Sequence, residues 1–225
     1  MLTHIRRHIS LLNYKFGFIK KSFGNNSFRL LDIGAGNHSA SKTCFIFPTC
    51  RYFGVDLNKY YNNDQRDFEA AEKFYEIDLV QLDYRVIPDN GFDFIRMTHV
   101  IEHLINGDQV IINLLQKLEE GGYIYIEYPS RRSTGLPSMH GTLNFYDDPT
   151  HVRIYSLAEI RALLTSHGCI VLEGGTRRNW WNILAMPVRI IASLITTGKL
   201  QGNIFWDLFG FAEYVYARKN PLLKQ

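Results

Sequence analysis

A glycine-rich turn and two later acids carry the clearest chemical signal in this sequence. Residues 30–37 (LLDIGAGN) run from an apolar stretch into Gly34 and Gly36, where missing side chains would let a ligand approach the backbone. Asp56 closes the next apolar stretch, where a carboxylate can accept hydrogen bonds from both hydroxyls of a ribose. Asp78 closes the third stretch, where it could accept from an adenine amino group. The pattern therefore predicts a nucleoside-binding site.

A polar loop over residues 130–155 holds the candidates for acid–base chemistry, which are His140, Asp147, Asp148 and His151. His151, with Asp148 three residues before it, could form an oriented imidazole–carboxylate pair that takes a proton from a hydroxyl acceptor. Two alternatives stay open. His140, Asp148 and His151 could hold a divalent metal, or the pair could only brace the loop. We take His151, Asp148 and His140 as the catalytic candidates, with no metal assigned.

Residues 99–103 (HVIEH) match the His-x-x-Glu-His spacing of one metallopeptidase class. On a helix, His99 and His103 would share a face and could bind zinc, with Glu102 as the general base of a hydrolase. The segment directly follows an apolar, strand-like run, and this position favours a role in shaping a ligand pocket.

Two other nucleotide-binding patterns are incomplete. Residues 36–43 (GNHSASKT) lack the second glycine of a phosphate-binding loop, because Ser41 stands in its place, and Pro48 soon ends the helix that should follow. A nicotinamide-dependent reductase is disfavoured because Ser39 replaces the third glycine of Gly-x-Gly-x-x-Gly and the sequence has no Tyr-x-x-x-Lys pair.

Short apolar runs alternate with longer mixed segments, which predicts an α/β fold with a parallel sheet. Strands are expected at residues 28–33, 51–55, 75–77, 92–97, 123–128, 169–172 and 211–216. Helices are expected at residues 39–47, 64–74 and 110–118, the last ended by Gly121-Gly122, and after Ser156, which forms a capping box with Glu159. Since the carboxyl ends of parallel strands meet at one edge, the glycine turn, Asp56 and Asp78 should lie together there.

These residues resemble the class I S-adenosylmethionine-dependent methyltransferases over about residues 28–218. Asp32, Gly34 and Gly36 match the family's acidic and glycine motif, and residues 92–104 look like its fourth strand and following helix start. The resemblance implies a Rossmann-like, doubly wound, mostly parallel seven-stranded sheet with a C-terminal antiparallel strand. It implies S-adenosyl-L-methionine (SAM) as the cofactor. The implied cofactor-binding residues are Asp32, Gly34, Ala35, Gly36, Asn37, Asp56, Leu57, Asp78, Leu79, Thr98 and His99.

The implied activity is methyl transfer to an oxygen of a small molecule, glycan or lipid-linked intermediate. The sequence lacks the Asn/Asp-Pro-Pro-Tyr signature of enzymes that methylate exocyclic or amide nitrogen. His38 stands where the family often has a third glycine. This departure keeps a second hypothesis open, a nucleotide-binding or interaction module with the same fold and no turnover.

Charge and cysteine content narrow the partners and the compartment. Residues 1–21 hold five basic side chains and no acid, whereas the rest of the chain carries 20 basic and 22 acidic ones. A nearly neutral body disfavours a nucleic-acid partner. The three cysteines follow no disulfide or zinc spacing, which is typical of a reducing compartment. We expect a cytoplasmic protein.

The chain divides into a basic N-terminal arm or helix (1–27), a methyltransferase domain (28–219) and a tail (220–225). Within the domain, residues 180–209 form an apolar helical insert before the last strand, interrupted by Pro187 and Arg189 and therefore not expected to span a membrane. Residues 1–23 and 180–209 are candidates for peripheral contact with the inner face of a membrane. The insert could instead form a homodimer face, an apolar acceptor wall or a cover for one sheet edge.

Overall fold

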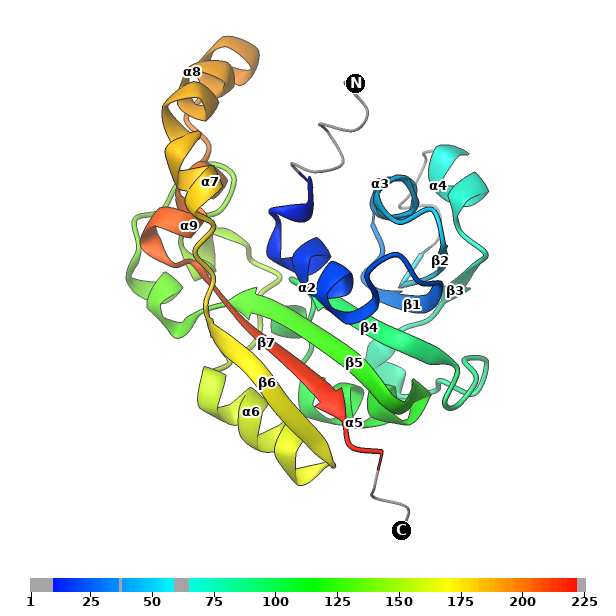
Figure 1. Ribbon diagram of the computed structural model, residues 1–225. Coiled ribbons are helices and arrows are strands. Elements are labelled where there is room, and N and C mark those ends of the chain that lie inside the picture. The colour runs from blue at the N-terminus through cyan, green and yellow to red at the C-terminus, as the bar shows by residue number, and fades with distance from the viewer. Residues whose placement is uncertain (1–9, 37, 59–64, 222–225) are drawn as a thin grey trace.

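The computed structural model describes residues 10–36, 38–58 and 65–221. Within these ranges seven strands form one sheet in the order β3-β2-β1-β4-β5-β7-β6 (Figure 1). They are β1 (Phe28–Ile33), β2 (Cys50–Asp56), β3 (Lys73–Glu76), β4 (Phe92–Thr98), β5 (Leu118–Pro129), β6 (Cys169–Thr176) and β7 (Ala212–Lys219). Strand β7 is antiparallel to both of its neighbours, and the other adjacent pairs are parallel. The predicted seven-stranded sheet with a C-terminal antiparallel strand is confirmed.

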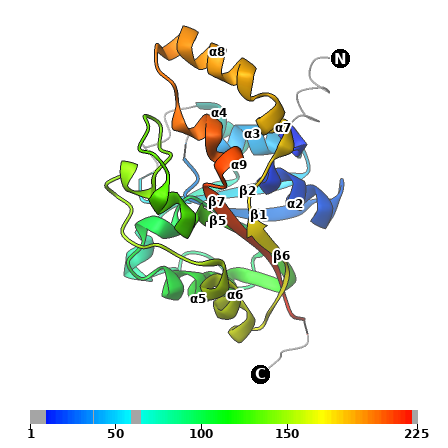
Figure 2. The same ribbon diagram turned by 90° about the vertical axis from the view of Figure 1, so that its left-hand side faces the viewer.

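Helices cover both faces of the sheet (Figures 1 and 2). One face carries α2 (Tyr14–Phe23), α3 (Ser39–Ile46) and α4 (Gln65–Ala70), and the other carries α5 (Gly107–Lys117) and α6 (Leu157–Ser166). Because successive strand residues point to opposite faces, Leu30 packs into the core under α2 and α3, whereas Leu31 packs into the core under α5 and α6. The sheet is thus buried on both sides, as a parallel sheet requires.

Local sequence signals predicted the bounds of several elements to within a few residues. β1 and α3 begin and end within one residue of the expected bounds. The predicted capping box is present, since the Glu159 N–H donates to Ser156 Oγ (3.3 Å) and the Ser156 N–H donates to Glu159 Oε2 (2.8 Å). Helix α5 ends at Lys117, four residues before the Gly121-Gly122 stop, because β5 begins at Leu118 to pair with Phe92.

The helix expected over residues 64–74 is partly wrong. Helix α4 ends at Ala70, and Lys73 and Phe74 belong to β3, which ends at Glu76. Pairing with β2 decides this, since Gly54 lies opposite Phe74 and a Cβ on Gly54 would come within 2.4 Å of the Phe74 ring. The glycine therefore makes room for an aromatic strand residue. Asp64 lies outside the described residues.

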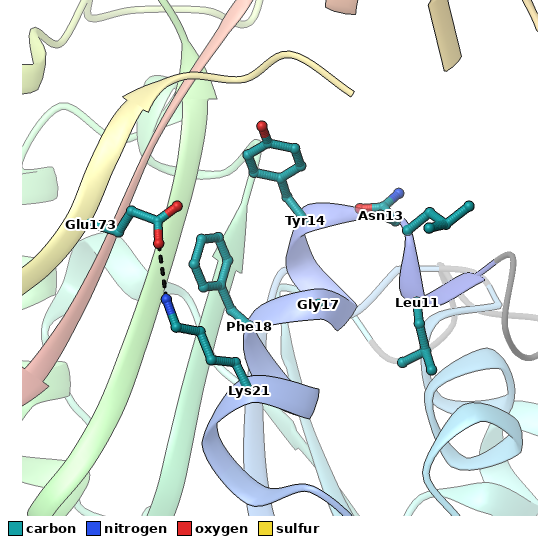
Figure 3. A pocket seen from close by; sticks show the side chains of 8 residues that line it. Leu11, Asn13, Tyr14, Gly17, Phe18, Lys21 and Glu173 are labelled. Carbon is teal, nitrogen blue, oxygen red and sulfur yellow. Dashed lines mark hydrogen bonds and ion pairs between the residues drawn. The ribbon is translucent and has the colours of Figure 1, made fainter. Parts of the chain in front are cut away.

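Helix α2 docks on the sheet. Phe16, Phe18 and Ile19 are buried, and the Phe18 ring stacks on Tyr216 of β7 with ring centroids 4.5 Å apart. Figure 3 shows Lys21 of α2 pointing toward Glu173 of β6, and this ion pair measures 3.0 Å. Of the arm or helix expected over residues 1–27, residues 14–23 thus form a helix that packs on the sheet.

The insert after β6 contains α7 (Trp180–Leu184) and α8 (Met186–Thr197), and α8 projects away from the sheet (Figures 1 and 2). Pro187 lies in the first turn of α8, where its missing N–H is tolerated. A 3-10 turn and α9 (Trp206–Phe209) return the chain to β7. Among the described residues, none of the helices has both the length and the apolar character that crossing a membrane requires.

Candidate cofactor and acceptor site

A pocket of about 350 Å³ opens where β1, β4 and β5 end. Its lining residues are Asn13, Lys15, Asp32, Gly34, Ala35, Gly36, Ser39, Thr98, His99, Glu127, Arg177 and Trp206. Six predicted cofactor residues are among them: Asp32, Gly34, Ala35, Gly36, Thr98 and His99. The pocket thus lies at the predicted edge of the sheet. Besides the ends of the strands, α2 and the segment between β6 and β7 also contribute to it.

The glycine turn has the backbone shape that its sequence predicts. Gly34 has a φ of +71°, and a Cβ there would come within 2.3 Å of Val100 Cγ2. The N–H groups of Gly34 and Ala35 both donate to the Val55 carbonyl, at 2.9 and 3.0 Å. The Gly36 N–H donates to Asp56 Oδ2 at 3.0 Å. The turn is therefore held against the end of β2 and cannot accept a side chain at position 34.

His38 replaces the missing third glycine without breaking the turn. It adopts a left-handed conformation with a φ of +62°, which histidine tolerates better than most non-glycine residues. Its N–H donates to Asp67 Oδ2 at 2.5 Å, and the Ser41 N–H donates to Asp67 Oδ1 at 2.7 Å. The fully buried Asp67, from α4, thus holds the first turn of α3, and sequence reasoning missed this contact between distant segments.

Asp32 is buried and paired with Arg96 of β4. Arg96 Nε and Nη2 donate to the two carboxylate oxygens at 2.7 and 2.6 Å, and the hydroxyls of Ser39 and Tyr52 also donate to Asp32. Burial opposes ionisation of Asp32, but the charge and hydrogen bonds of Arg96 outweigh it and lower the pKa of the carboxyl. An arginine inside the apolar run 92–97 was the available signal, because a buried guanidinium needs an acidic partner.

Helix α2 brings a lysine into the pocket. Lys15 lines it beside Asn13, which caps the helix by accepting from the Lys15 N–H at 3.3 Å. Burial, with the nearby Arg96 charge, lowers the pKa of Lys15 to about 8, although Asp32 and Glu127 both act to raise it. Lys15 therefore sits between two carboxylates, in a segment that the sequence assigned to a separate arm.

A second buried carboxylate, Glu127, ends β5 on the far side of the pocket. It accepts hydrogen bonds from His99 Nε2 (3.0 Å), Arg177 Nη1 (2.7 Å) and the Tyr125 hydroxyl (2.5 Å). Burial alone would raise the pKa of Glu127, but Arg177 and His99 hold it well below its usual range. Arg177 also donates to Asp207 of α9 at 3.0 Å. Four segments far apart in sequence thus form one charged wall.

His99 connects this charged wall to Glu102, three residues further along the chain. Its Nδ1 lies 3.3 Å from Glu102 Oε1, and its ring lies 4.9 Å from the Trp206 ring. Burial opposes the imidazolium, but hydrogen bonds to Glu102 and Glu127 raise the pKa of His99 to about 9. His99 therefore carries its proton at neutral pH and acts as a hydrogen-bond donor. Its φ of +55° ends β4 with a sharp change of direction.

The remaining predicted cofactor residues lie beside this pocket or on the β3 side. Asp56 accepts from the Gly36 and Leu57 N–H groups, at 3.0 and 2.8 Å, and Leu57 is exposed. Asp78 accepts from the Val80 N–H at 3.0 Å and lines a separate hollow of about 460 Å³, while Leu79 is buried. Asn37 lies outside the described residues. The ribose and adenine roles of the two acids stay predictions.

The predicted catalytic residues lie behind His99 and do not line the pocket. His151 Nε2 lies 3.9 Å from Asp148 Oδ2, so the expected pair is close in space. His140 is exposed, and its carbonyl accepts from the Gly202 N–H at 2.6 Å. Asp147 braces the loop by accepting from the N–H groups of Leu143 and Asn144. The catalytic roles stay predictions, and within the described ranges His140 does not join Asp148 and His151 in a metal-binding group.

The helical His-x-x-Glu-His zinc site is wrong. The segment begins directly after β4 and ends in the 3-10 turn η3 (Ile101–His103), and its two histidines face different partners. His99 contacts Glu127, whereas His103 Nδ1 lies 2.9 Å from Thr150 Oγ1. The reason is the left-handed backbone at His99, which prevents the continuous helix that the i, i+4 argument requires.

The sheet order and the glycine turn define a class: the Rossmann-like fold of SAM-dependent methyltransferases, with its ligand edge where β1 and β4 end. Residues 4–173 match a family model described as a methyltransferase domain. The chain therefore belongs to the methyltransferase-domain family, and the predicted methyltransferase class with SAM as cofactor is confirmed.

Individual proteins agree with this assignment. An uncharacterized methyltransferase of Bacillus subtilis, YcgJ, is 25% identical over 143 residues, which span 62% of this chain and 56% of that protein. A SAM-dependent methyltransferase from Archaeoglobus fulgidus shares the fold with a TM-score of 0.57, at 21% identity over 92% of this chain and 100% of its own. Phosphoethanolamine N-methyltransferase 2 of Haemonchus contortus, in complex with SAM, has a TM-score of 0.62 at 19% identity, over 91% of this chain and 51% of its own.

Proposed function

We propose that this chain transfers a methyl group from SAM to an oxygen of a small molecule, glycan or lipid-linked intermediate. The pocket carries the proposal, because its two walls differ in chemistry. On one wall, Gly34 and Gly36 carry no side chains, so a cofactor can approach the backbone of the glycine turn closely. His99, Glu127 and Arg177 form a charged wall that can hydrogen-bond hydroxyls, and the Trp206 indole, which is stacked on Phe211, lines the pocket beside them.

The residues of the pocket fit the cofactor. Gly34 keeps the turn in the shape that lines the pocket, because a Cβ there would come within 2.3 Å of Val100 Cγ2. The Lys15 ammonium would pair with the carboxylate of the methionine part, and Asp56 would accept from the ribose hydroxyls. When bound, SAM supplies an electrophilic methyl group on a positively charged sulfur. The protein contributes alignment of the acceptor oxygen with that methyl carbon.

Methylation of a hydroxyl forms a carbon–oxygen bond, breaks a carbon–sulfur bond and releases the hydroxyl proton. His99 does not accept that proton, because it already carries one at neutral pH. His151 stays the proposed acceptor of that proton, and because it does not line the pocket, the proton would have to reach it through an intervening group. The Nδ1–H of His151 donates to the Phe145 carbonyl at 2.6 Å, so Nε2 holds the lone pair, and Asp148 would stabilise the imidazolium that forms.

Calorimetric titration with S-adenosylhomocysteine, the demethylated cofactor, tests whether the glycine turn binds the cofactor. The wild-type chain should bind one molecule with a micromolar Kd. Gly34→Ala should weaken binding at least tenfold, because its Cβ would meet Val100 at a φ of +71°. Gly175→Ala is the matched control, since a Cβ there meets nothing within 4 Å and its φ is not positive. Equal affinity of all three proteins would overturn the assignment of the turn.

The same titration tests the proposed pairing of Lys15 with the carboxylate of the cofactor. Lys15→Met should weaken binding about tenfold, which is the size of one charge-assisted hydrogen bond. Lys21→Met is the control on the same helix, because Lys21 forms an exposed ion pair with Glu173. If both variants bind like the wild type, Lys15 does not hold the carboxylate.

Incubation with SAM carrying a radiolabelled methyl group tests the acceptor class. Separate pools of sugar nucleotides, oligosaccharides and lipid-linked glycans would be offered, and the labelled products would be treated with mild alkali. Alkali-stable label on a sugar hydroxyl supports the proposal, and label on nitrogen contradicts it. Cofactor binding without transfer to any pool would favour the inactive module instead.

We also propose that α8 rests on an anionic lipid surface. Leu184, Val188, Ile191 and Ile195 recur at helical spacing and are between 59% and 79% exposed. Trp180 and Trp181 precede this stripe and are also exposed. Residues 180–206 contain Arg189 and Lys199 and no acid. An apolar stripe with aromatic and basic neighbours is the pattern of an interfacial helix.

Vesicle flotation tests this surface. The chain should float with vesicles that contain phosphatidylserine and stay unbound with pure phosphatidylcholine. Ile195→Asp should abolish flotation, whereas Val86→Asp, at an exposed apolar residue far from α8, should leave it unchanged. No flotation of the wild type, together with a dimer by light scattering that Ile195→Asp dissociates, would assign the stripe to a second copy of the chain.

A further inference from the structure

Three side chains that could bind a metal ion meet behind the pocket wall. Glu102 and His103 come from η3, and His151 comes from the loop after β5. One ligand atom of each lies within 4.8 Å of the others. Glu102 is 1% exposed, and the two histidines are partly buried. The group consists of two imidazoles and one carboxylate, a donor set that first-row transition metals prefer.

The backbone holds the two segments in register. The Glu102 carbonyl accepts from the N–H groups of Val152 and Arg153, at 2.9 and 3.2 Å. These bonds fix residues 150–153 against η3, although the segments lie about 50 positions apart in sequence. The arrangement therefore does not depend on the three side chains meeting by chance on flexible loops.

Hydrogen bonds also set the tautomer of both histidines. His151 Nδ1 lies 2.6 Å from the Phe145 carbonyl, which can only accept, so Nδ1 carries the proton. His103 Nδ1 lies 3.2 Å from the Thr150 carbonyl and 2.9 Å from Thr150 Oγ1, whose own proton goes to Asp148 at 2.5 Å. In both neutral rings the lone pair is therefore on Nε2. Metal-binding histidines are commonly oriented by a backbone carbonyl in this way.

Two carboxylate oxygens lie near His151 Nε2 without hydrogen-bonding to it. Glu102 Oε1 lies 4.0 Å and Asp148 Oδ2 3.9 Å from that nitrogen, which is too far for hydrogen bonds. Glu102 Oε2 is buried and has no hydrogen-bond partner among the described residues. Metal–ligand bonds of about 2.0–2.2 Å separate neighbouring ligands by roughly 3–4 Å. The Glu102–His151 separation lies at the upper end of this range, and the whole group, within 4.8 Å, would have to draw together slightly to share one cation.

We propose that Glu102, His103 and His151 form a binding site for one divalent first-row transition metal, with Asp148 beside it. The site differs from the helical zinc motif considered from sequence, because Glu102 is a ligand here and His99 is not. Glu102 Oε1 also contacts His99, which lines the pocket, so the cation lies one side chain behind the acceptor wall.

The site has a consequence that rests on the proposed function. A cation bound at His151 Nε2 would occupy the lone pair with which this imidazole would take up the hydroxyl proton. Methyl transfer to oxygen should then be slower in the metal-loaded chain than in the metal-free chain. The binding site itself does not depend on that reaction.

The test is metal titration of the chelator-treated, full-length chain without cofactor. Calorimetry with Zn²⁺, and separately with Mn²⁺, should show one site per chain with micromolar or tighter Kd for at least one ion. His103→Gln should weaken binding at least tenfold, and Glu102→Gln should do the same. His140→Gln is the matched control, because His140 is an exposed histidine of the same loop. Binding no tighter than millimolar, or equal binding by all variants, would overturn the proposal.

Two further measurements separate the alternatives. Co²⁺ should give visible absorption bands that His103→Gln removes and His140→Gln keeps, even if Glu102→Gln fails to fold. Affinity for S-adenosylhomocysteine should be the same in His103→Gln and the wild type. Cofactor binding without metal binding would overturn the metal site alone, and metal binding without cofactor binding would overturn the proposed function alone.

Discussion

Two buried carboxylates line the same pocket, Asp32 at the end of β1 and Glu127 at the end of β5. Each accepts from a tyrosine hydroxyl and pairs with an arginine. Their surroundings differ. Arg96 has Asp32 as its acidic partner and otherwise contacts the hydroxyls of Ser39 and Thr43. Glu127 belongs to a network in which Arg177 also pairs with Asp207 and His99 also contacts Glu102.

The difference separates a fixed side of the pocket from an adjustable one. Asp32 and Arg96 form one closed pair beneath the glycine turn, so the cofactor side has a single arrangement. On the Glu127 side each cation has a second acid, so loss of one contact leaves another. Such redundancy would let the proposed acceptor side of the pocket exchange hydrogen bonds when an acceptor binds.

The largest expected effect is at the closed pair. Asp32→Asn should lower the free energy of unfolding by about 4 kcal/mol, because it leaves the buried Arg96 charge without an acid. Urea unfolding measures this loss. Replacing both residues, as Asp32→Asn with Arg96→Met, should recover a large part of it. A loss below about 1 kcal/mol in the single variant would show that the pair is not closed.

Lys15 reports on both carboxylates through its titration. Its folded pKa of about 8 lies below the ordinary value of 10.5. The folded state therefore disfavours the ammonium, and this cost disappears as pH rises from 8 to 10.5. Relative to Lys15→Met, wild-type stability should rise by roughly 3 kcal/mol across that window. A flat or falling difference would contradict the burial of Lys15.

The titration of Lys15 also distinguishes the effect of Asp32 from that of Glu127. Asp32 and Glu127 each raise the pKa of Lys15, and Asp32 does so more strongly. Removing either negative charge should shift the stability rise to lower pH, further in Asp32→Asn than in Glu127→Gln. The reverse order would place Lys15 closer to Glu127 than to Asp32.

Glu127→Gln should cost about 2 kcal/mol, half the effect of Asp32→Asn, because Arg177 keeps Asp207 and His99 keeps Glu102. Chemical denaturation of the two variants under the same conditions measures the ratio. Equal losses would mean that the second acids do not compensate, and the two sides of the pocket would then be equally rigid.

The smallest effect is expected outside both sides, at the start of α6. Ser156→Ala removes the capping-box hydroxyl and should cost about 1 kcal/mol of stability, with unchanged affinity for S-adenosylhomocysteine. Ser166→Ala, at an exposed hydroxyl near the other end of α6, is the control and should change neither quantity. A change in cofactor affinity would show that α6 influences the pocket.

Sequence reasoning was most accurate where the signal is local. The glycine turn, α3 and the capping box each depend on residues fewer than ten positions apart, and each lies where it was expected. It was least accurate where a contact joins distant segments. Phe74 entered β3 because of Gly54, Asp67 reached the start of α3, and Arg177 met Glu127 across 50 positions. Arg96 and Glu127 stood inside apolar runs and signalled buried partners without naming them.

The order of the elements, the glycine turn with its cofactor edge, and the resemblance to a family could all be predicted from the residues alone. This was possible because backbone conformation, capping and face alternation depend on neighbouring residues. The folded chain was needed to show that α2 brings Lys15 into the pocket, that two differently paired carboxylates line it, and that His103 and His151 meet beside Glu102. Those contacts arise when chain folding brings remote side chains together, and spacing along the sequence carries no record of that distance.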